Sequence, residues 1–262
     1  MKKTAAVTGA SSGIGYEIAK GFLSRGYAVY GLSRSAGVPE GAVHIRCDVA
    51  DEASAAEAIE RIAEDHEKLD VLINCAGIGI SGSVEDTPLE LAEVQLDVNI
   101  LGSMRVIRCA LPLLRRADSP IIINISSVAA VTPIAFQAYY SASKAALNAL
   151  TCALKNELAP EGIRVCAVLP GDTKTGFTDS REKVPASERY RARAERSVSK
   201  MEKDERQGMD PAKVALKVLS VAGKPRVRPL YVVGAFYSLV GFLAKILPVA
   251  LVNRVLYEMY AK

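Results

Sequence analysis

The 262-residue chain contains no tryptophan, only two histidines and five scattered cysteines. No Cys-x-x-Cys pair occurs and two histidines are too few for a His/Cys cluster, so the sequence predicts no metal site. An odd number of dispersed cysteines indicates reduced, mostly buried thiols, as in a cytoplasmic protein. The N-terminus runs from Lys2 and Lys3 straight into an apolar strand, so we expect no cleavable signal peptide.

A strong excess of one charge is also missing. The net charge of +4 is too small to indicate a nucleic-acid partner. Half of the residues are apolar and 24% are charged, as in ordinary globular proteins. Enough apolar material is therefore present for a large core, and the length is close to the upper limit for a single one.

Short apolar runs alternate with amphipathic helical patterns along most of the chain. This alternation predicts a parallel sheet with helices on both faces. The run 120–125 is almost continuously apolar, which is typical of a strand buried on both faces. Strands are expected at 5–8, 28–33, 43–46, 69–73, 120–125, 164–169 and 228–233, and helices from 14 onward and at 52–66, 88–98, 100–116 and 140–158.

A glycine-rich loop follows the first expected strand and leads into a helical pattern. Its glycines let the backbone turn tightly and approach a pyrophosphate, which would sit on the N–H groups of the helix start. The loop alone would indicate no more than a turn, but after an N-terminal strand it is typical of a dinucleotide-binding βαβ unit. We therefore expect an α/β fold with a single Rossmann-type, doubly wound parallel sheet of about seven strands. The loop residues are Thr8, Gly9, Ala10, Ser11, Ser12, Gly13, Ile14 and Gly15.

Tyr140 and Lys144 lie four residues apart at the start of the helix expected at 140–158, and so share one face. A phenol has a reference pKa near 10, and a nearby ammonium favours the phenolate and lowers that pKa. The pair would then act as a general acid/base near pH 7. Tyr139 lacks such a partner, because Ser143 stands four residues after it. The spacing alone is also compatible with a surface tyrosine and lysine at a helix start.

Taken together, the motifs resemble those of the short-chain dehydrogenase/reductase family. They occur in the family's order and spacing over about residues 4 to 175, and one departure is Cys75, where many members carry a second asparagine. We expect the fold to match as far as Val233. The residues that carry the resemblance are the loop 8–15, Asp48, Asn74-Cys75-Ala76-Gly77, Asn99, Asn124-Ile125-Ser126-Ser127, Tyr140 with Lys144, and Pro170-Gly171.

The resemblance implies a catalytic tetrad of Asn99, Ser127, Tyr140 and Lys144. Ser127 stands just past a strand end, where α/β sheets place ligands, and its hydroxyl would stabilise charge on the substrate oxygen. Ser126 would face the other way. Tyr140 would exchange the proton, and Lys144 would bind the nicotinamide ribose. Asn99 would hold a water that connects Lys144 to solvent, although the residue alone is equally compatible with a helix kink or cap.

Charge at the end of the second strand indicates which dinucleotide is bound. Arg34 offers a permanently charged fork suited to a 2′-phosphate, the nearest acid is Glu40, and the alternative is that Arg34 only reaches solvent. We therefore expect NADP(H) rather than NAD(H). Asp48 and Val49 would adjoin the adenine by resemblance. The expected cofactor-binding residues are Gly9, Ser11, Ser12, Gly13, Ile14, Gly15, Ser33, Arg34, Ser35, Asp48, Val49, Asn74, Ala76, Gly77, Asn99, Tyr140, Lys144, Pro170, Gly171, Thr173 and Thr175.

A catalytic domain is expected at 1–233. Two segments depart from the pattern of strands alternating with helices. The first is an excursion at 172–210, whose charged part 181–207 predicts a solvated helix or, alternatively, a lid over the substrate. The second is the C-terminal extension 234–262, in which Pro248 separates two apolar helical patterns. It is interrupted too often for a membrane-spanning helix, which needs about 20 apolar residues. We expect it to pack on the protein and narrow an apolar pocket, the alternative being a basic, apolar helix lying on a membrane surface.

We expect an NADP(H)-dependent oxidoreductase acting on a carbonyl or secondary alcohol. A small lipophilic substrate is favoured because similar extensions occur in family members that act on steroids or retinoids, and this is an analogy at the level of the fold. The alternatives are reduction of 3-oxoacyl thioesters and, in another class, a non-catalytic NADP(H) sensor. A sensor would not need Ser127 and Tyr140 in register with Lys144. By resemblance, the helices at 100–116 and 140–158 would form a homodimer interface.

Overall fold

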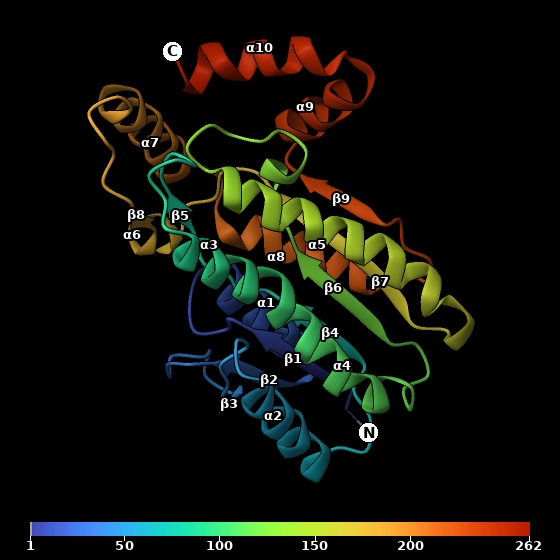
Figure 1. The fold of residues 1–262 in the computed structure, drawn as a ribbon. Helices are drawn as coiled ribbons and strands as arrows, with labels where there is room; N and C mark the ends of the chain where they lie inside the picture. The colour runs from blue at the N-terminus through green and yellow to red at the C-terminus, as the bar shows by residue number, and fades with distance from the viewer. Residues whose placement is uncertain (1) are drawn as a thin grey trace.

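A computed structural model describes residues 2–262 and contains a seven-stranded parallel sheet (Figure 1). The strand order is β3-β2-β1-β4-β6-β7-β9, with every neighbouring pair parallel. The expected Rossmann-type, doubly wound sheet is therefore confirmed. The strands are β1 (Thr4–Thr8), β2 (Ala28–Ser33), β3 (Val43–Arg46), β4 (Val71–Asn74), β6 (Ile121–Ile125), β7 (Arg164–Pro170) and β9 (Leu230–Val233).

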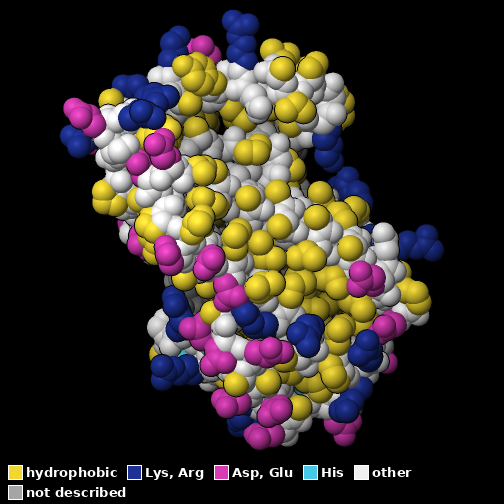
Figure 2. Space-filling model, viewed as in Figure 1, with side chains coloured by type: hydrophobic (Ala, Val, Ile, Leu, Met, Phe, Trp, Pro, Cys, Tyr) yellow, Lys and Arg dark blue, Asp and Glu magenta, His cyan; other side chains and the backbone are white. Residues whose placement is uncertain are grey.

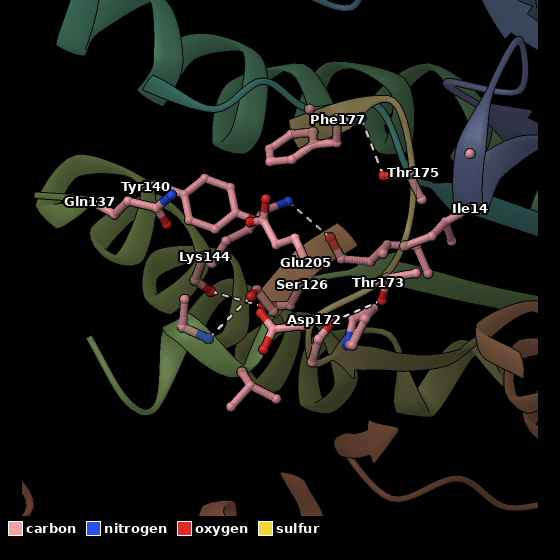
Figure 3. A pocket seen from close by; sticks show the side chains of 18 of the residues that line it. Ile14, Ser126, Gln137, Tyr140, Lys144, Asp172, Thr173, Thr175, Phe177 and Glu205 are labelled. Carbon is pink, nitrogen blue, oxygen red and sulfur yellow. Dashed lines mark hydrogen bonds between the residues drawn. The ribbon is translucent and has the colours of Figure 1, made fainter. Parts of the chain in front are cut away.

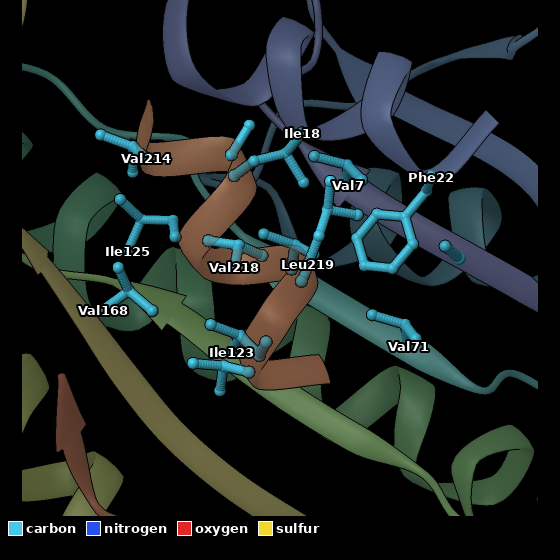
Figure 4. Packing of buried hydrophobic residues seen from close by; sticks show 14 of the residues in the cluster. Val7, Ile18, Phe22, Val71, Ile123, Ile125, Val168, Val214, Val218 and Leu219 are labelled. Atoms are coloured by element: carbon cyan, nitrogen blue, oxygen red, sulfur yellow. The ribbon is translucent and has the colours of Figure 1, made fainter. Parts of the chain in front are cut away.

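Helices cover both faces of this sheet (Figure 1). One face carries α1 (Gly13–Ser24) and α8 (Pro211–Ala222), whose apolar residues pack with those of the strands (Figure 4). Continuously apolar strands fit this arrangement, since both of their faces are buried. Helix α8 was not among the predicted helices. The other face carries α2 (Glu52–Asp65), α3 (Leu89–Leu96), the π-helical turn η1 (Asp97–Leu101), α4 (Gly102–Leu114) and α5 (Ala138–Glu157), and the short turns η2 (Val128–Ala130) and η3 (Ala159–Glu161) flank α5.

The chain reverses its winding between β1 and β4. From β1 it proceeds outward through β2 and β3, and then returns to place β4 on the other side of β1. Such a switch point opens a crevice at the carboxyl ends of the strands. The Thr8 hydroxyl joins the two strand ends by accepting hydrogen bonds from the backbone N–H groups of Cys75 (2.9 Å) and Ala76 (3.0 Å).

The excursion and the extension are both helical and both lie beyond this carboxyl edge (Figure 1). In the excursion, β8 forms a small second sheet with β5, which sequence patterns did not reveal. In the extension, two helices meet at Pro248 as expected. Among residues 2–262, no helix combines the length and the apolar character needed to cross a membrane. The elements are β5 (Ile80–Ser81), α6 (Phe177–Ser180), β8 (Glu182–Lys183), α7 (Arg191–Arg206), α9 (Ala235–Ile246) and α10 (Val249–Tyr260).

Candidate active site

A cleft of about 870 Å³ lies at the carboxyl edge of the sheet (Figure 3). It brings together residues from every segment that the sequence motifs singled out. Asn74 and Asn99 are the two predicted site residues that do not line it. The predicted residues on its walls are Gly9, Ser11, Ser12, Gly13, Ile14, Gly15, Ser33, Arg34, Ser35, Asp48, Val49, Ala76, Gly77, Ser127, Tyr140, Lys144, Pro170, Gly171, Thr173 and Thr175.

The glycine loop has a backbone shape that side chains would obstruct. Gly9 and Gly13 have φ values of +68° and +54°, in the left-handed region that favours glycine. A Cβ on Gly15 would lie 2.2 Å from the Gly9 carbonyl oxygen. The loop therefore leaves its backbone open to the cleft at the N-terminus of α1, where N–H groups can hold a phosphate.

The end of β2 forms the outer part of the cleft. Arg34 is exposed and lines the cleft, and it takes part in no ion pair among residues 2–262. The Ser35 hydroxyl donates to the Ser11 hydroxyl over 3.5 Å, which brings this segment to the glycine loop. Asp48 also lines the cleft, and its side chain accepts a hydrogen bond from the Ala50 N–H group. A cationic fork and hydroxyl groups are thus available to an anion at this end.

Tyr140 projects from the first turn of α5 into the cleft, beside Phe177, with 5.8 Å between the ring centroids (Figure 3). Loss of hydration raises the pKa of Tyr140 to about 12, while a hydrogen bond with Ser127 and the charge of Arg181 act in the opposite direction. The expectation that Lys144 lowers this pKa is wrong for the chain by itself, because desolvation outweighs the stabilising contacts. The phenol is therefore protonated at neutral pH.

Lys144 lies on the same face of α5, as the four-residue spacing predicted. Its Nζ lies 5.8 Å from the centroid of the Tyr140 ring and donates to the Ile125 carbonyl oxygen over 3.0 Å. Burial lowers the pKa of Lys144 to about 8. The ammonium is thus held at the end of β6 rather than in direct contact with the phenol oxygen.

The two serines after β6 have different roles, as the alternation along an extended segment indicated. The Ser126 hydroxyl is buried and donates to the Lys144 carbonyl oxygen over 3.2 Å, so it ties β6 to α5. The Ser127 hydroxyl accepts from the Ala129 N–H group over 3.1 Å and caps η2. Ser127 also reaches Tyr140, so the two hydroxyl groups of the predicted pair are adjacent in the cleft.

Asn99 is fully buried within the π-helical turn between α3 and α4. Its side-chain amide exchanges hydrogen bonds with both backbone groups of Ile78 (2.9 and 3.0 Å) and donates to the Ser143 hydroxyl (3.0 Å). A Cβ on Gly77 would lie 3.1 Å from the Asn99 side-chain oxygen and 3.5 Å from the Lys144 Nζ. Asn99 therefore lies in an irregular turn of the helix, as the residue type alone permitted, and it also lies near Lys144.

Asn74 lies behind the cleft wall instead of on it. Its amide donates to the side-chain oxygen of Asn124 over 2.9 Å, and Asn124 in turn donates to the Thr151 hydroxyl over 2.9 Å. This buried chain joins β4, β6 and α5. Asn74 thus positions the strand end, and the following residues, Cys75 to Gly77, reach the cleft.

Sequence reasoning found Thr173 and Thr175 but missed other cleft residues that the excursion supplies. Asp172, Phe177 and Glu205 line the cleft together with the predicted residues (Figure 3). Glu205 comes from α7, where it accepts hydrogen bonds from Thr178 (2.7 Å) and Arg181. Helix α7 is charged and at least partly exposed along most of its length, as expected of a solvated helix, and it adds Glu205 to the cleft. The position of Asp172 directly after Pro170-Gly171 was the one signal in the sequence for its place in the site.

The extension forms a further wall of the cleft. A Cβ on Gly171 would meet the ring of Tyr237 at 2.3 Å, so α9 packs directly on the strand end. The Tyr237 hydroxyl donates to Asp172 over 2.6 Å, and the Tyr260 hydroxyl lies 3.5 Å from the Asp204 carboxylate. The extension contributes these residues to the lining: Phe236, Tyr237, Val240, Leu243, Ala244, Leu247, Leu251, Val252, Val255, Leu256, Met259 and Tyr260.

Solved structures share this fold over nearly the whole chain. A short chain dehydrogenase from Burkholderia cenocepacia in complex with NADP has a TM-score of 0.78 and 25% sequence identity, covering 97% of both chains. A 3-ketoacyl-(acyl-carrier-protein) reductase from Brucella melitensis complexed with NADH has a TM-score of 0.74 and 26% identity, covering 88% of this chain and 95% of that one. These similarities and the glycine loop support a nicotinamide dinucleotide as the cofactor.

Similarity in sequence leads to the same class of protein. The chain is 38% identical over 222 residues to a 3-ketodihydrosphingosine reductase from Bacteroides thetaiotaomicron. The matched region covers 83% of this chain and 82% of the relative. Residues 3–185 match the model of the family described as short chain dehydrogenase. The glycine loop, the Ser127–Tyr140 contact and Lys144 are in place within this match. The chain therefore belongs to the short-chain dehydrogenase/reductase family and is an oxidoreductase.

Proposed function

We propose that the protein is an NADP(H)-dependent reductase that interconverts a carbonyl group and a secondary alcohol on a small lipophilic molecule. The observation that carries the proposal is that Ser127 and Tyr140 line one cleft together with apolar side chains of α9 and α10. Two hydroxyl groups on one side of a cleft can both hydrogen-bond to the substrate oxygen. A bound nicotinamide cofactor would supply the hydride.

Tyr140 carries its proton at neutral pH, as a proton donor in carbonyl reduction must. Because the pKa of Tyr140 is raised to about 12, the phenol carries its proton and can donate it to the oxygen that becomes the alcohol. Ser127 would donate its hydroxyl hydrogen to the same oxygen and stabilise the charge developing there. Lys144 places a cation close to the tyrosine, so a phenolate formed after the transfer would be stabilised.

The walls of the cleft support a lipophilic substrate. From the extension, mainly apolar side chains of α9 and α10 line the region beyond Tyr140. A substrate chain lying along these helices would remove apolar surface from water at about 25 cal/mol per Å². The relative that acts on 3-ketodihydrosphingosine supports a lipid ketone over a short polar one. A 3-oxoacyl thioester is the competing substrate for the same chemistry.

Arg34 supports NADP(H) over NAD(H), because it is an exposed guanidinium in the outer part of the cleft. Purified protein should oxidise NADPH when a long-chain ketone is added. The reaction is measured by the absorbance of the reduced nicotinamide. The Arg34→Asp variant should then prefer NADH. A charge-assisted contact to phosphate is worth about 1.5–3 kcal/mol, so the NADPH/NADH ratio of kcat/KM should change by about tenfold or more.

Lys20→Asp is the matched control for this substitution, because it changes the net charge equally at an exposed position of α1 outside the cleft. It should leave the preference unchanged. Equal use of both cofactors by the unmutated protein would refute the NADP(H) assignment. Reduction of 3-oxoacyl thioesters and not of free lipid ketones would refute the proposed substrate class.

We propose a homodimer formed through α4 and α5. Apolar side chains cover the face over these helices (Figure 2), and Leu101 beside α4 is 51% exposed. The same patch on two copies can pair about a two-fold axis. Helix α9 packs against the edge strand β9, which would hinder a further contact through that edge. Light scattering at micromolar concentration should give the mass of a dimer, and the mass of a monomer would contradict this interface.

We further propose that the protein is cytoplasmic and that its C-terminal extension lines the protein's own cleft. The five cysteines are free thiols, two of them buried and three partly buried, which fits a reducing compartment. Side chains on the inner sides of α9 and α10 line the cleft. Their outer sides expose apolar residues such as Phe242 and Ile246, so contact with a membrane surface is the competing role of the same helices (Figure 2).

A further inference from the structure

We propose that Asp172 binds a cationic amine on the substrate, so that the preferred ligand is a lipophilic amino ketone. This inference rests on the proposed carbonyl reduction and assigns a specificity-determining residue within that cleft. Asp172 lines the cleft and takes no part in the proton transfer described above (Figure 3).

The strand register places Asp172 at the same edge of the sheet as Ser127. Ile125 of β6 is paired with Val168 of β7, so Ser127 stands level with Pro170 at the carboxyl edge. Asp172 follows two residues later, on the neighbouring strand end about 5 Å to the side. Ser127 and Asp172 line the same cleft, so a substrate whose carbonyl is held by Ser127 can extend toward this carboxylate.

Asp172 has no cation of its own. Among residues 2–262 it forms no ion pair, and the hydroxyl of Tyr237 is the one side-chain donor to its carboxylate. Glu205, the other carboxylate at this end of the cleft, is paired with Arg181. Burial and the negative charges of Glu205 and Asp204 raise the pKa of Asp172, and they outweigh the hydrogen bond from Tyr237 and the charge of Lys200.

An uncompensated carboxylate beside apolar walls selects for a positive charge. Asp172 is partly buried in a cleft with apolar walls, where an alkylammonium group would gain a charge-assisted hydrogen bond that is stronger than one in open water. A neutral ketone of the same length would leave the carboxylate without such a partner. The cleft thus combines a carbonyl site at Ser127 and Tyr140, a cation site at Asp172 and an apolar wall on α9 and α10.

The test compares two substrates on the unmutated enzyme and on Asp172→Asn. One is a long-chain ketone with an amino group next to the carbonyl, and the other has hydrogen in place of that amino group. Asparagine keeps an acceptor for Tyr237 but removes the charge. The variant should lose about tenfold or more in kcat/KM for the amino ketone, as expected for a charge-assisted bond, and lose little for the plain ketone.

Asp179→Asn is the matched control, because this exposed carboxylate of α6 lies outside the main cleft. It should leave the ratio of the two kcat/KM values unchanged. Asp172→Glu retains the charge and should retain a preference for the amino ketone, so it replaces the asparagine variant if that one does not fold.

The outcomes separate this inference from the proposed function. If the enzyme reduces both ketones and Asp172→Asn lowers both rates equally or changes neither, the amine site is refuted while carbonyl reduction stands. If the unmutated enzyme reduces neither ketone, the proposed function is refuted and the amine site with it. A preference for the plain ketone by the unmutated enzyme would also overturn the assignment of Asp172.

Discussion

Tyr140→Phe should lower kcat for carbonyl reduction by about 10²-fold or more, which is the scale of general acid catalysis. The substitution retains the ring that packs against Phe177 and removes only the hydroxyl that meets Ser127. Binding of NADPH, measured by fluorescence titration, should change little, because the glycine loop and Arg34 are untouched. The loss should therefore appear in turnover and not in cofactor affinity.

Tyr139→Phe is the control for this experiment. Tyr139 is the preceding residue on α5, is partly buried and does not line the cleft. Its replacement removes an identical hydroxyl and should leave kcat within about twofold, since surface-type changes away from the site have small effects. Normal turnover by Tyr140→Phe with a substrate that the unmutated enzyme reduces would show that Tyr140 is not the proton donor.

Deletion of residues 235–262 should lower the melting temperature and greatly reduce activity on long-chain ketones. The deletion removes the packing of Tyr237 on Gly171, its hydrogen bond to Asp172 and the apolar wall of the cleft. Large apolar side chains of the extension such as Val240 and Leu256 are only partly buried, so each loss should be smaller than the ~1.5–3 kcal/mol of full burial. Several such losses together should still be a measurable part of a typical folding free energy. Thermal unfolding and kinetics on short and long ketones measure the two effects.

Single substitutions distinguish the inner and outer sides of the extension. Leu256→Ser changes a residue on the cleft wall and should reduce kcat/KM for long ketones more than for short ones. Phe242→Ser is its control on the outer side, where the residue is 59% exposed and does not line the cleft. A deletion variant that keeps its melting temperature and its activity on both substrates, yet no longer sediments with liposomes, would favour the membrane role.

Periodicity was sufficient for most of the fold, because strand and helix patterns are local. The strand expected at 69–73 is observed at Val71–Asn74, and the one expected at 228–233 begins at Leu230. Helix α8 was missed although its apolar residues form part of the core against α1. The pairing of β5 with β8 was also missed, since two-residue strands 102 residues apart, as from Ile80 to Glu182, leave no periodic pattern.

The spacing of Tyr140 and Lys144 is determined by the sequence alone, because helical geometry places residues four apart on one face. The sequence alone does not determine whether the pKa of Tyr140 is raised or lowered. The direction depends on how strongly the folded chain buries the phenol and on where the Lys144 Nζ is held, and both are set by β6 and the neighbouring loops. Spacing therefore identified the pair, and burial determined its protonation state.

The substrate end of the cleft was decided by tertiary structure. Asp172, Glu205 and the tyrosines of the extension are far apart in sequence, and only the return of α7, α9 and α10 over the carboxyl edge brings them together. Sequence patterns showed that α9 and α10 have apolar faces, but an apolar face by itself does not reveal what covers it. The fold decided this, because α9 leaves β9 beside Gly171 and thereby directs both helices across the cleft.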